Sequence, residues 1–223
     1  MSALSSAAKP EGELTATWGD TLGCLWTGWS CWIMAWLFLT AWWRPLQLED
    51  GRWVKLGVGV MVLEFILIHS GGVLHHLLEK RAGWSGWRQV AVLVAFYLIF
   101  ALGIALGFKS WWLLGSFALV MSGRLWSMFA GMTAMDLAIA RRRTVASALL
   151  YLGLVFATLF LPVPRGGLTP GVLDQVWPDR GGGEWEHKPE KALAMGAAYF
   201  LLLGWIEMRP PRRILPEKIS NRS

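Results

Sequence analysis

The stretch MVLEFILIHSGGVLHHLLEK, residues 61–80, is the part of the chain that decides its fold. It begins as an apolar run, yet it carries one carboxylate, Glu64, and three histidines, His69, His75 and His76, before its charged end. Apolar residues at this density over about 20 positions are typical of a helix that crosses a membrane. An ionisable side chain inside such a helix is costly unless it is paired, neutralised or in contact with water. The stretch therefore predicts both a membrane helix and a buried polar site within it.

The composition of the whole chain supports the same environment. Of its 223 residues, 55% are hydrophobic, 16% are charged and 16 are tryptophans, whereas an ordinary soluble domain is roughly 45–50% apolar and 25% charged. Tryptophan is enriched where membrane helices meet the lipid headgroups. The net charge of +6 is explained by attraction of basic turns to anionic lipid. No nucleic-acid-binding motif accompanies the basic residues, so we expect membrane lipids, and not nucleic acid, as partners.

Six apolar runs are long enough to cross a membrane. In hydrocarbon every backbone amide must bond within its own segment or within a closed barrel, and continuous runs without two-residue alternation select helices. The sequence therefore predicts an all-α, polytopic integral membrane bundle with about six transmembrane helices, at residues 22–43, 53–78, 90–108, 111–138, 145–163 and 192–208.

The distribution of lysine and arginine predicts the orientation of these spans. If both termini are cytoplasmic, the larger share of the 21 basic residues falls on the cytoplasmic side, including the cluster RRR at 141–143. The positive-inside rule therefore predicts that both termini are cytoplasmic, and we expect the protein in a bacterial-type cytoplasmic (inner) membrane. It has a cytoplasmic tail at 1–21, a transmembrane domain at 22–208 and a basic cytoplasmic tail at 209–223.

One connection is long: residues 164–191 are rich in glycine and proline and are predicted to lie outside the membrane. Such loops act as lids or as tethers, and we expect a tether here. The segment GVLDQVW predicts a short interfacial helix, with Trp177 and Trp185 as anchors. A weak metal-binding pattern is formed by Glu184, Glu186 and His187.

Two charged residues are predicted to meet at membrane depth. At about 1.5 Å per residue, Glu64 lies roughly 16 Å beyond Trp53 and Arg124 roughly 20 Å beyond Trp111. Because both helices are predicted to run inward from the outer face, the two side chains reach similar depths. Pairing lowers the desolvation cost of each charge, so we predict a Glu64–Arg124 ion pair inside the bundle.

Three interpretations fit this polar centre. In one, Glu64, His69 and Arg124 bind or move a proton or small solute, with His69 as the titrating group, Glu64 as the proton acceptor and Arg124 as the anion-attracting charge. In another, the three residues are a structural lock. In the third, His69 ligates a b-type haem, which needs a second ligand from another helix; the methionines available for this are Met121, Met128 and Met132.

The sequence predicts one fold class but several possible functions. The chain contains none of the phosphate-binding, dinucleotide-binding, hydrolase or zinc-protease motifs. We predict no catalytic residue and favour a protein that is not an enzyme, while intramembrane catalysis by Glu64 and His69 stays open, since a general acid or base needs only the right geometry and pKa. Cys24 and Cys31 have no zinc-site spacing and are expected to be reduced packing residues. The first hypothesis is a membrane protein that binds or moves a small solute or proton. The alternatives are a membrane-anchor subunit of a redox complex associated with haem or quinone, and an assembly or scaffold protein, so other membrane subunits are candidate partners.

Overall fold

The computed structural model of the protein describes residues 18–79, 84–107 and 134–209, together with positions 111, 114–115, 118–119 and 122. All regular elements within this part of the chain are helices. The predicted all-α class is therefore confirmed for the described residues.

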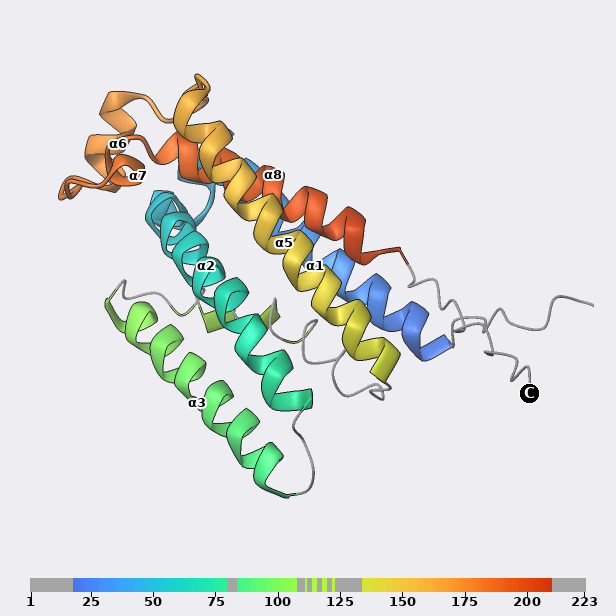
Figure 1. Ribbon diagram of the computed structural model, residues 1–223. Coiled ribbons are helices and arrows are strands. Elements are labelled where there is room, and N and C mark those ends of the chain that lie inside the picture. The colour runs from blue at the N-terminus through green and yellow to red at the C-terminus, as the bar shows by residue number, and fades with distance from the viewer. Residues whose placement is uncertain are drawn as a thin grey trace, which may run out of the picture.

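Five long helices make up most of the described part of the chain, and Figure 1 shows their arrangement. They match five of the six predicted spans, and they are α1 (Trp18–Trp43), α2 (Arg52–Glu79), α3 (Trp84–Gly107), α5 (Ala134–Phe160) and α8 (Pro189–Glu207). The largest difference is at the start of α5, which begins well before residue 145 and includes the three arginines at 141–143. Arginine is a good helix former, so the basic cluster continues the helix instead of forming a turn.

The remaining predicted span, residues 111–138, lies largely outside the described residues. Its last positions, 134–138, belong to the first turns of α5. Figure 1 shows α3 ending and α5 beginning at opposite ends of the bundle. The span at 111–138 stays a prediction.

Within the described residues, two helical segments are long and apolar enough to cross a membrane, namely Thr21–Trp43 and Arg141–Phe160. A third, Val94–Gly103, is apolar but shorter. The first two segments have the length and composition of membrane-crossing helices, and this supports a membrane location for the protein.

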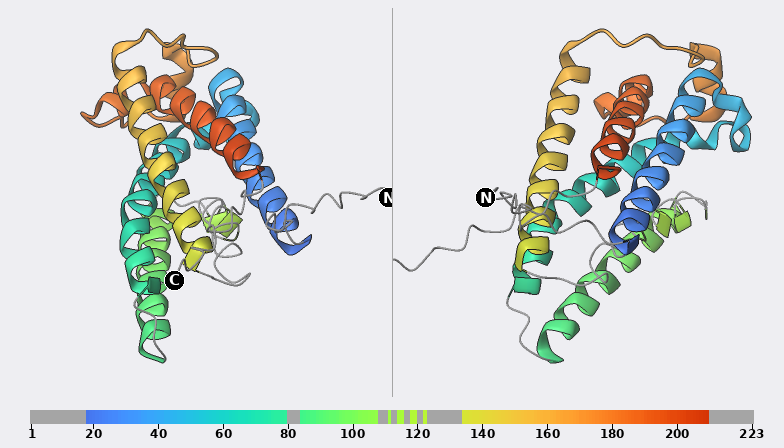
Figure 2. Two further views of the ribbon diagram at one scale, coloured as in Figure 1. Left: turned by 45° about the vertical axis from the view of Figure 1, so that its right-hand side comes forward. Right: turned by 90° about the vertical axis from the view of Figure 1, so that its right-hand side faces the viewer.

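Helices α2 and α8 supply most of the bundle interior. Side chains from α1, α2, α5 and α8 form one buried apolar cluster, and a smaller one lies between α2 and α3. Figure 2 shows α1 and α8 side by side. Their backbones approach where two glycines meet, since a Cβ on Gly204 would lie 3.0 Å from the carbonyl oxygen of Gly28. Small residues that allow such approach are typical of membrane helix contacts.

A folded cap covers one end of the bundle (Figure 1). It consists of η1 (Pro45–Gln47), η2 (Glu49–Gly51), α6 (Pro170–Val176) and α7 (Glu184–His187). The turn that leads into α2 is left-handed at three successive residues, with φ of 46° at Glu49, 52° at Asp50 and 88° at Gly51. Left-handed backbone at two non-glycine residues is uncommon and costs free energy, so the contacts of the cap have to offset this cost.

The segment 164–191 is part of this cap and is not an extended tether. The Gly167 amide donates to the Trp42 carbonyl at 3.0 Å, and the Trp42 indole N–H donates to the Pro164 carbonyl at 2.9 Å. The predicted short helix is confirmed as α6, whose first turn is capped by the Thr169 hydroxyl. Trp177 does not project outward as an anchor but is buried, with the Lys55 ammonium 5.9 Å from its ring centroid. Composition predicted the turns but not these contacts.

Candidate functional site

Glu64 lies where α2, α5 and α8 meet, and it is 1% exposed. The Tyr199 hydroxyl, on α8, donates a hydrogen bond to Oε1 of Glu64 at 2.6 Å. The neighbouring positions on the same side of α2, Met61 and Ile68, are buried apolar residues, so the helical period directs Glu64 into the bundle along with them. The expectation that this carboxylate faces the bundle interior agrees with the structure.

Two tyrosines enclose the carboxylate. Tyr199 is fully buried and Tyr151, on α5, is 2% exposed. Their rings pack edge to face with centroids 5.5 Å apart. The Tyr151 hydroxyl donates to the backbone carbonyl of Met61 at 2.8 Å, one helical turn from Glu64. Three helices therefore each contribute a polar group to one site, which we call the Glu64 centre: Glu64, Tyr151 and Tyr199.

Close packing between α2, α8 and α1 holds this centre in place. Gly57 on α2 faces Leu193, and Gly196 on α8 faces the ring of Phe38 from α1. Phe38 in turn packs against Phe200, with ring centroids 5.6 Å apart. Because Gly196 and Phe200 flank Tyr199 within one turn of α8, this packing fixes the position of the tyrosine hydroxyl.

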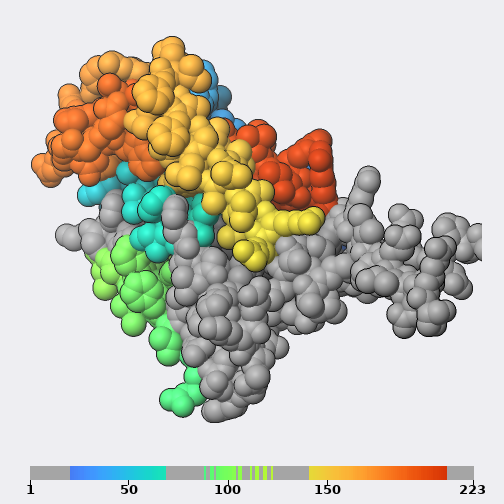
Figure 3. Space-filling model, viewed as in Figure 1, coloured from blue at the N-terminus to red at the C-terminus, as the bar shows by residue number. Residues whose placement is uncertain are grey.

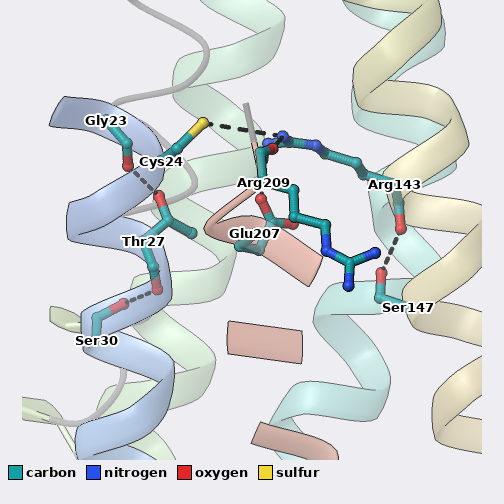
Figure 4. A network of polar contacts seen from close by, with 8 residues as sticks. All are labelled: Gly23, Cys24, Thr27, Ser30, Arg143, Ser147, Glu207 and Arg209. Atoms are coloured by element: carbon teal, nitrogen blue, oxygen red, sulfur yellow. Dashed lines mark hydrogen bonds and ion pairs between the residues drawn. The ribbon is translucent and has the colours of Figure 1, made fainter. Parts of the chain in front are cut away.

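A second polar cluster joins α5, α8 and α1 (Figure 4). It lies where α8 ends, at the end of the bundle opposite the cap (Figure 1). Arg143 forms an ion pair with Glu207 at 2.8 Å, donates to the Arg209 carbonyl at 3.0 Å and contacts Sγ of Cys24 at 3.9 Å. The Ser147 hydroxyl donates to the Arg143 carbonyl at 2.9 Å. Both members of the ion pair are largely buried, with side chains 23% and 15% exposed. The cluster ties the ends of three helices together.

The structure describes the side chains of only some of the predicted site residues. Glu64 is described in full, whereas for His69, His75 and His76 the structure describes the backbone in α2 and not the side chain. Arg124 lies outside the described residues, as do the methionines proposed as haem ligands. The Glu64–Arg124 ion pair and the haem site therefore stay predictions.

The sequence analysis missed both tyrosines and the partner of Arg143. Tyr199 is an aromatic residue in an apolar run, and its partner Glu64 is 135 residues away. Glu207 is 64 residues from Arg143. A search for polar groups at matching depths on other helices would have listed these residues, but it would not have paired them.

The metal-binding pattern in the cap has a different explanation. Glu184 accepts hydrogen bonds from Lys191 at 2.9 Å and from Lys188 at 3.2 Å. These hydrogen bonds, the one to Lys191 first, lower the pKa of the Glu184 carboxyl. Within the described residues, no group of three or more His, Cys, Asp and Glu side chains is arranged to hold a metal ion. Glu184, the first residue of α7, therefore acts as a salt-bridge acceptor for two lysines at the start of α8.

Comparison with known proteins adds no assignment, since no family model, curated protein or solved structure matches this chain. The chemistry of the Glu64 centre has to be argued from its own geometry. A buried carboxyl bonded to a phenol hydroxyl can bind a proton and pass it along the hydrogen bond. The same pair can also serve as a fixed bond between two helices.

Proposed function

We propose that the chain is a multi-pass integral membrane protein of the bacterial-type inner membrane, with six spans and both termini in the cytoplasm. In this proposal the Glu64 centre binds and releases a proton inside the bundle, and it does so without catalysing a reaction. The single observation that carries the proposal is the complete burial of Glu64 at the contact of three helices, in a hydrogen bond with Tyr199.

The exposed surface supports the lipid environment. In the apolar window of α5, 17% of the residues are buried, although a helix of this hydropathy in a soluble protein would lie mostly in the core. Large apolar side chains therefore face outward along it, including Leu149 at 66% and Phe160 at 82% exposure. Exposing such a surface to water is costly at roughly 25 cal/mol per Å², whereas hydrocarbon removes that cost.

The positions of the helix ends support the proposed orientation. α1 begins and α8 ends at the same end of the bundle, where α5 also begins (Figure 1). The three arginines at 141–143 and Arg209 lie at that end. By the positive-inside rule this end is cytoplasmic, and the cap is then external. Six spans require one further crossing between α3 and α5, for which we retain the part of the predicted span 111–138 that precedes Ala134.

The depth of Glu64 supports a role in handling protons. It lies twelve positions beyond Arg52, the first residue of α2, which is about 18 Å along a helix that crosses a hydrocarbon layer of about 30 Å. In the proposed six-span arrangement, the carboxylate then lies near the middle of the layer. Ionisable groups at that depth are expensive and commonly mark proton or solute pathways. His69 and Arg124 remain the proposed additional members of the pathway.

Infrared difference spectroscopy during a pH titration of the protein in lipid tests this proposal. We expect a pH-dependent C=O stretch of a buried carboxyl group that disappears in Glu64→Gln and shifts in Tyr199→Phe, because the phenol bond is then lost. Glu190→Gln, which removes another buried carboxylate of α8, is the control and should retain the band. A wild-type protein without a titrating buried carboxyl would mean that the Glu64 centre is a structural lock.

A second candidate function is a membrane subunit of a redox complex, because α1 has an unusual outer face. Four tryptophans recur on it at spacings of three and seven residues and are all about half exposed: Trp26, Trp29, Trp36 and Trp43. Between them lies a groove of about 320 Å³ lined by Trp29, Trp32, Ile33 and Trp36. Spacings of three and seven suit packing against another helix. A Soret band in the purified protein that is lost in His69→Ala would favour this function, and a colourless preparation would eliminate the haem-bound form of it.

A further inference from the structure

The three consecutive arginines of α5 have different surroundings. Arg143 is engaged by Glu207 and by the Arg209 carbonyl. Arg141 and Arg142 are exposed, and neither has an acidic partner among the residues that the structure describes. Adjacent guanidinium groups without a counter-ion attract an anion, and their planar forks match the paired oxygens of a phosphate group.

An exposed apolar stripe continues from these arginines along the same side of α5. At about 100° per residue, its members lie within about 80° of Arg141 around the helix. All of them are exposed, and they are Val145, Leu149, Leu152 and Phe156. Figure 3 shows α5 crossing the outer surface of the molecule. The surface is therefore cationic at one end and apolar along its length.

The arginines lie at the level where lipid headgroups are expected. Arg141 is the first residue of the apolar segment that ends at Phe160. At the same end of the bundle, the Arg209 guanidinium lies over the Trp205 ring, 5.4 Å from its centroid, and Trp205 is 58% exposed. Exposed tryptophan is enriched at that boundary. From Arg141 to Leu152 the stripe is about 16 Å long, which is close to one leaflet of a layer of about 30 Å.

We propose that α5 carries a binding site for one anionic phospholipid, an inference that rests on the proposed membrane location. Arg141 and Arg142 bind the phosphate group, and Val145, Leu149 and Leu152 contact an acyl chain. Charge complementarity selects a lipid with net negative charge over a zwitterionic one. The stripe selects a phospholipid over a free phosphate ion, because a phosphate ion has no chain to contact it. Arg143 is not a ligand; it orients α5 by its bond to Glu207.

Native mass spectrometry of the full-length protein, extracted from membranes in a neutral detergent, tests the site. The probes are phosphatidylglycerol, phosphatidylcholine and inorganic phosphate. We expect the wild type to retain phosphatidylglycerol in preference to phosphatidylcholine, and Arg141→Gln/Arg142→Gln to bind it about thirtyfold more weakly, since each cation near an anionic headgroup contributes about a factor of five. The matched control is Arg44→Gln/Arg165→Gln, which removes two exposed arginines at the cap end and should keep the preference.

Several results would overturn the site. The first is that the wild type retains the two lipids equally, and the second is that the control variant loses as much phosphatidylglycerol binding as Arg141→Gln/Arg142→Gln. The third is that inorganic phosphate competes with the lipid with the same affinity. If the protein requires detergent for extraction but gives one of these results, the lipid site fails and the proposed membrane location stands. If the wild type is recovered in the soluble fraction without detergent, the proposed function fails as well. Both double variants count as folded if their circular dichroism spectra match that of the wild type.

Discussion

Glu64 and Tyr199 show that a buried carboxylate needs a hydrogen-bond donor, which here comes from a residue far away in the sequence. In hydrocarbon the cost of an unsatisfied acceptor is several kcal/mol, so α8 has to present a donor at the depth of Glu64. The tyrosine hydroxyl does this at 2.6 Å, and its ring fills the space between α2 and α5. Sequence reasoning identified Glu64 because a charge in an apolar run is conspicuous, whereas a tyrosine in such a run is ordinary.

The two tyrosines of the Glu64 centre should differ in their contribution to stability. Tyr199→Phe removes a bond to a carboxylate, and we expect it to lower the free energy of unfolding by about 1.5 kcal/mol, the low end for hydrogen bonds to charged groups. Tyr151→Phe removes a bond to a carbonyl that is already within a helix, and we expect about 0.6 kcal/mol, the average for hydrogen bonds in membrane bundles. Thermal unfolding in detergent measures both. Equal effects would contradict the proposed role of the carboxylate as the stronger acceptor.

At the scale of helices, contacts between glycines and aromatic rings determine the packing. A Cβ on Gly196 would overlap the ring of Phe38, whereas one on Gly153 of α5 would have no heavy atom within 4 Å. The approximate positions of the long described helices were predictable, because apolar runs of this length have few alternatives. Which helices contact one another was not predictable, because glycine positions on separate runs do not indicate their partners.

Alanine substitution at these two glycines tests the packing directly. Gly196→Ala should destabilise the protein by about 1–3 kcal/mol, the usual cost of overpacking a filled interior. Gly153→Ala adds the same methyl group to an open surface and should leave the unfolding temperature unchanged or slightly raised, since alanine is the better helix former. If both variants have the stability of the wild type, α1 and α8 do not pack as described.

The start of α8 should be sensitive to acid. Hydrogen bonds from Lys191 and Lys188 lower the pKa of Glu184 below its ordinary value of 4.5. A carboxyl whose pKa is depressed by folding contributes stability above its unfolded pKa, and the contribution is lost as the pH falls through the folded value. We therefore expect hydrogen exchange at residues 184–191 to accelerate below pH 4.5 relative to the rest of the cap. Glu184→Gln should show faster exchange already at neutral pH and no further acceleration of this kind on acidification.

At the scale of the whole molecule, the bundle has one cationic end, one capped end and apolar sides. In the proposed membrane location, the exposed apolar side chains along α5 face hydrocarbon while Glu64 is buried between helices. The orientation, with both termini in the cytoplasm, stays a prediction from the distribution of charge. The folding of residues 164–191 into a cap was not predictable, since glycine and proline predict turns but not what those turns contact.

The central claim is that hydrocarbon surrounds the outer face of α5. Spin labels test this claim directly. A spin label at Leu149→Cys, in a background with Cys24→Ala and Cys31→Ala, reports collisions with oxygen and with a water-soluble nickel chelate in lipid vesicles. A label at Asp174→Cys, on the exposed side of the cap, is the control for water. The account predicts that the label at Leu149 collides mainly with oxygen and the label at Asp174 mainly with the nickel chelate. A label at Leu149 that collides mainly with the nickel chelate would contradict it.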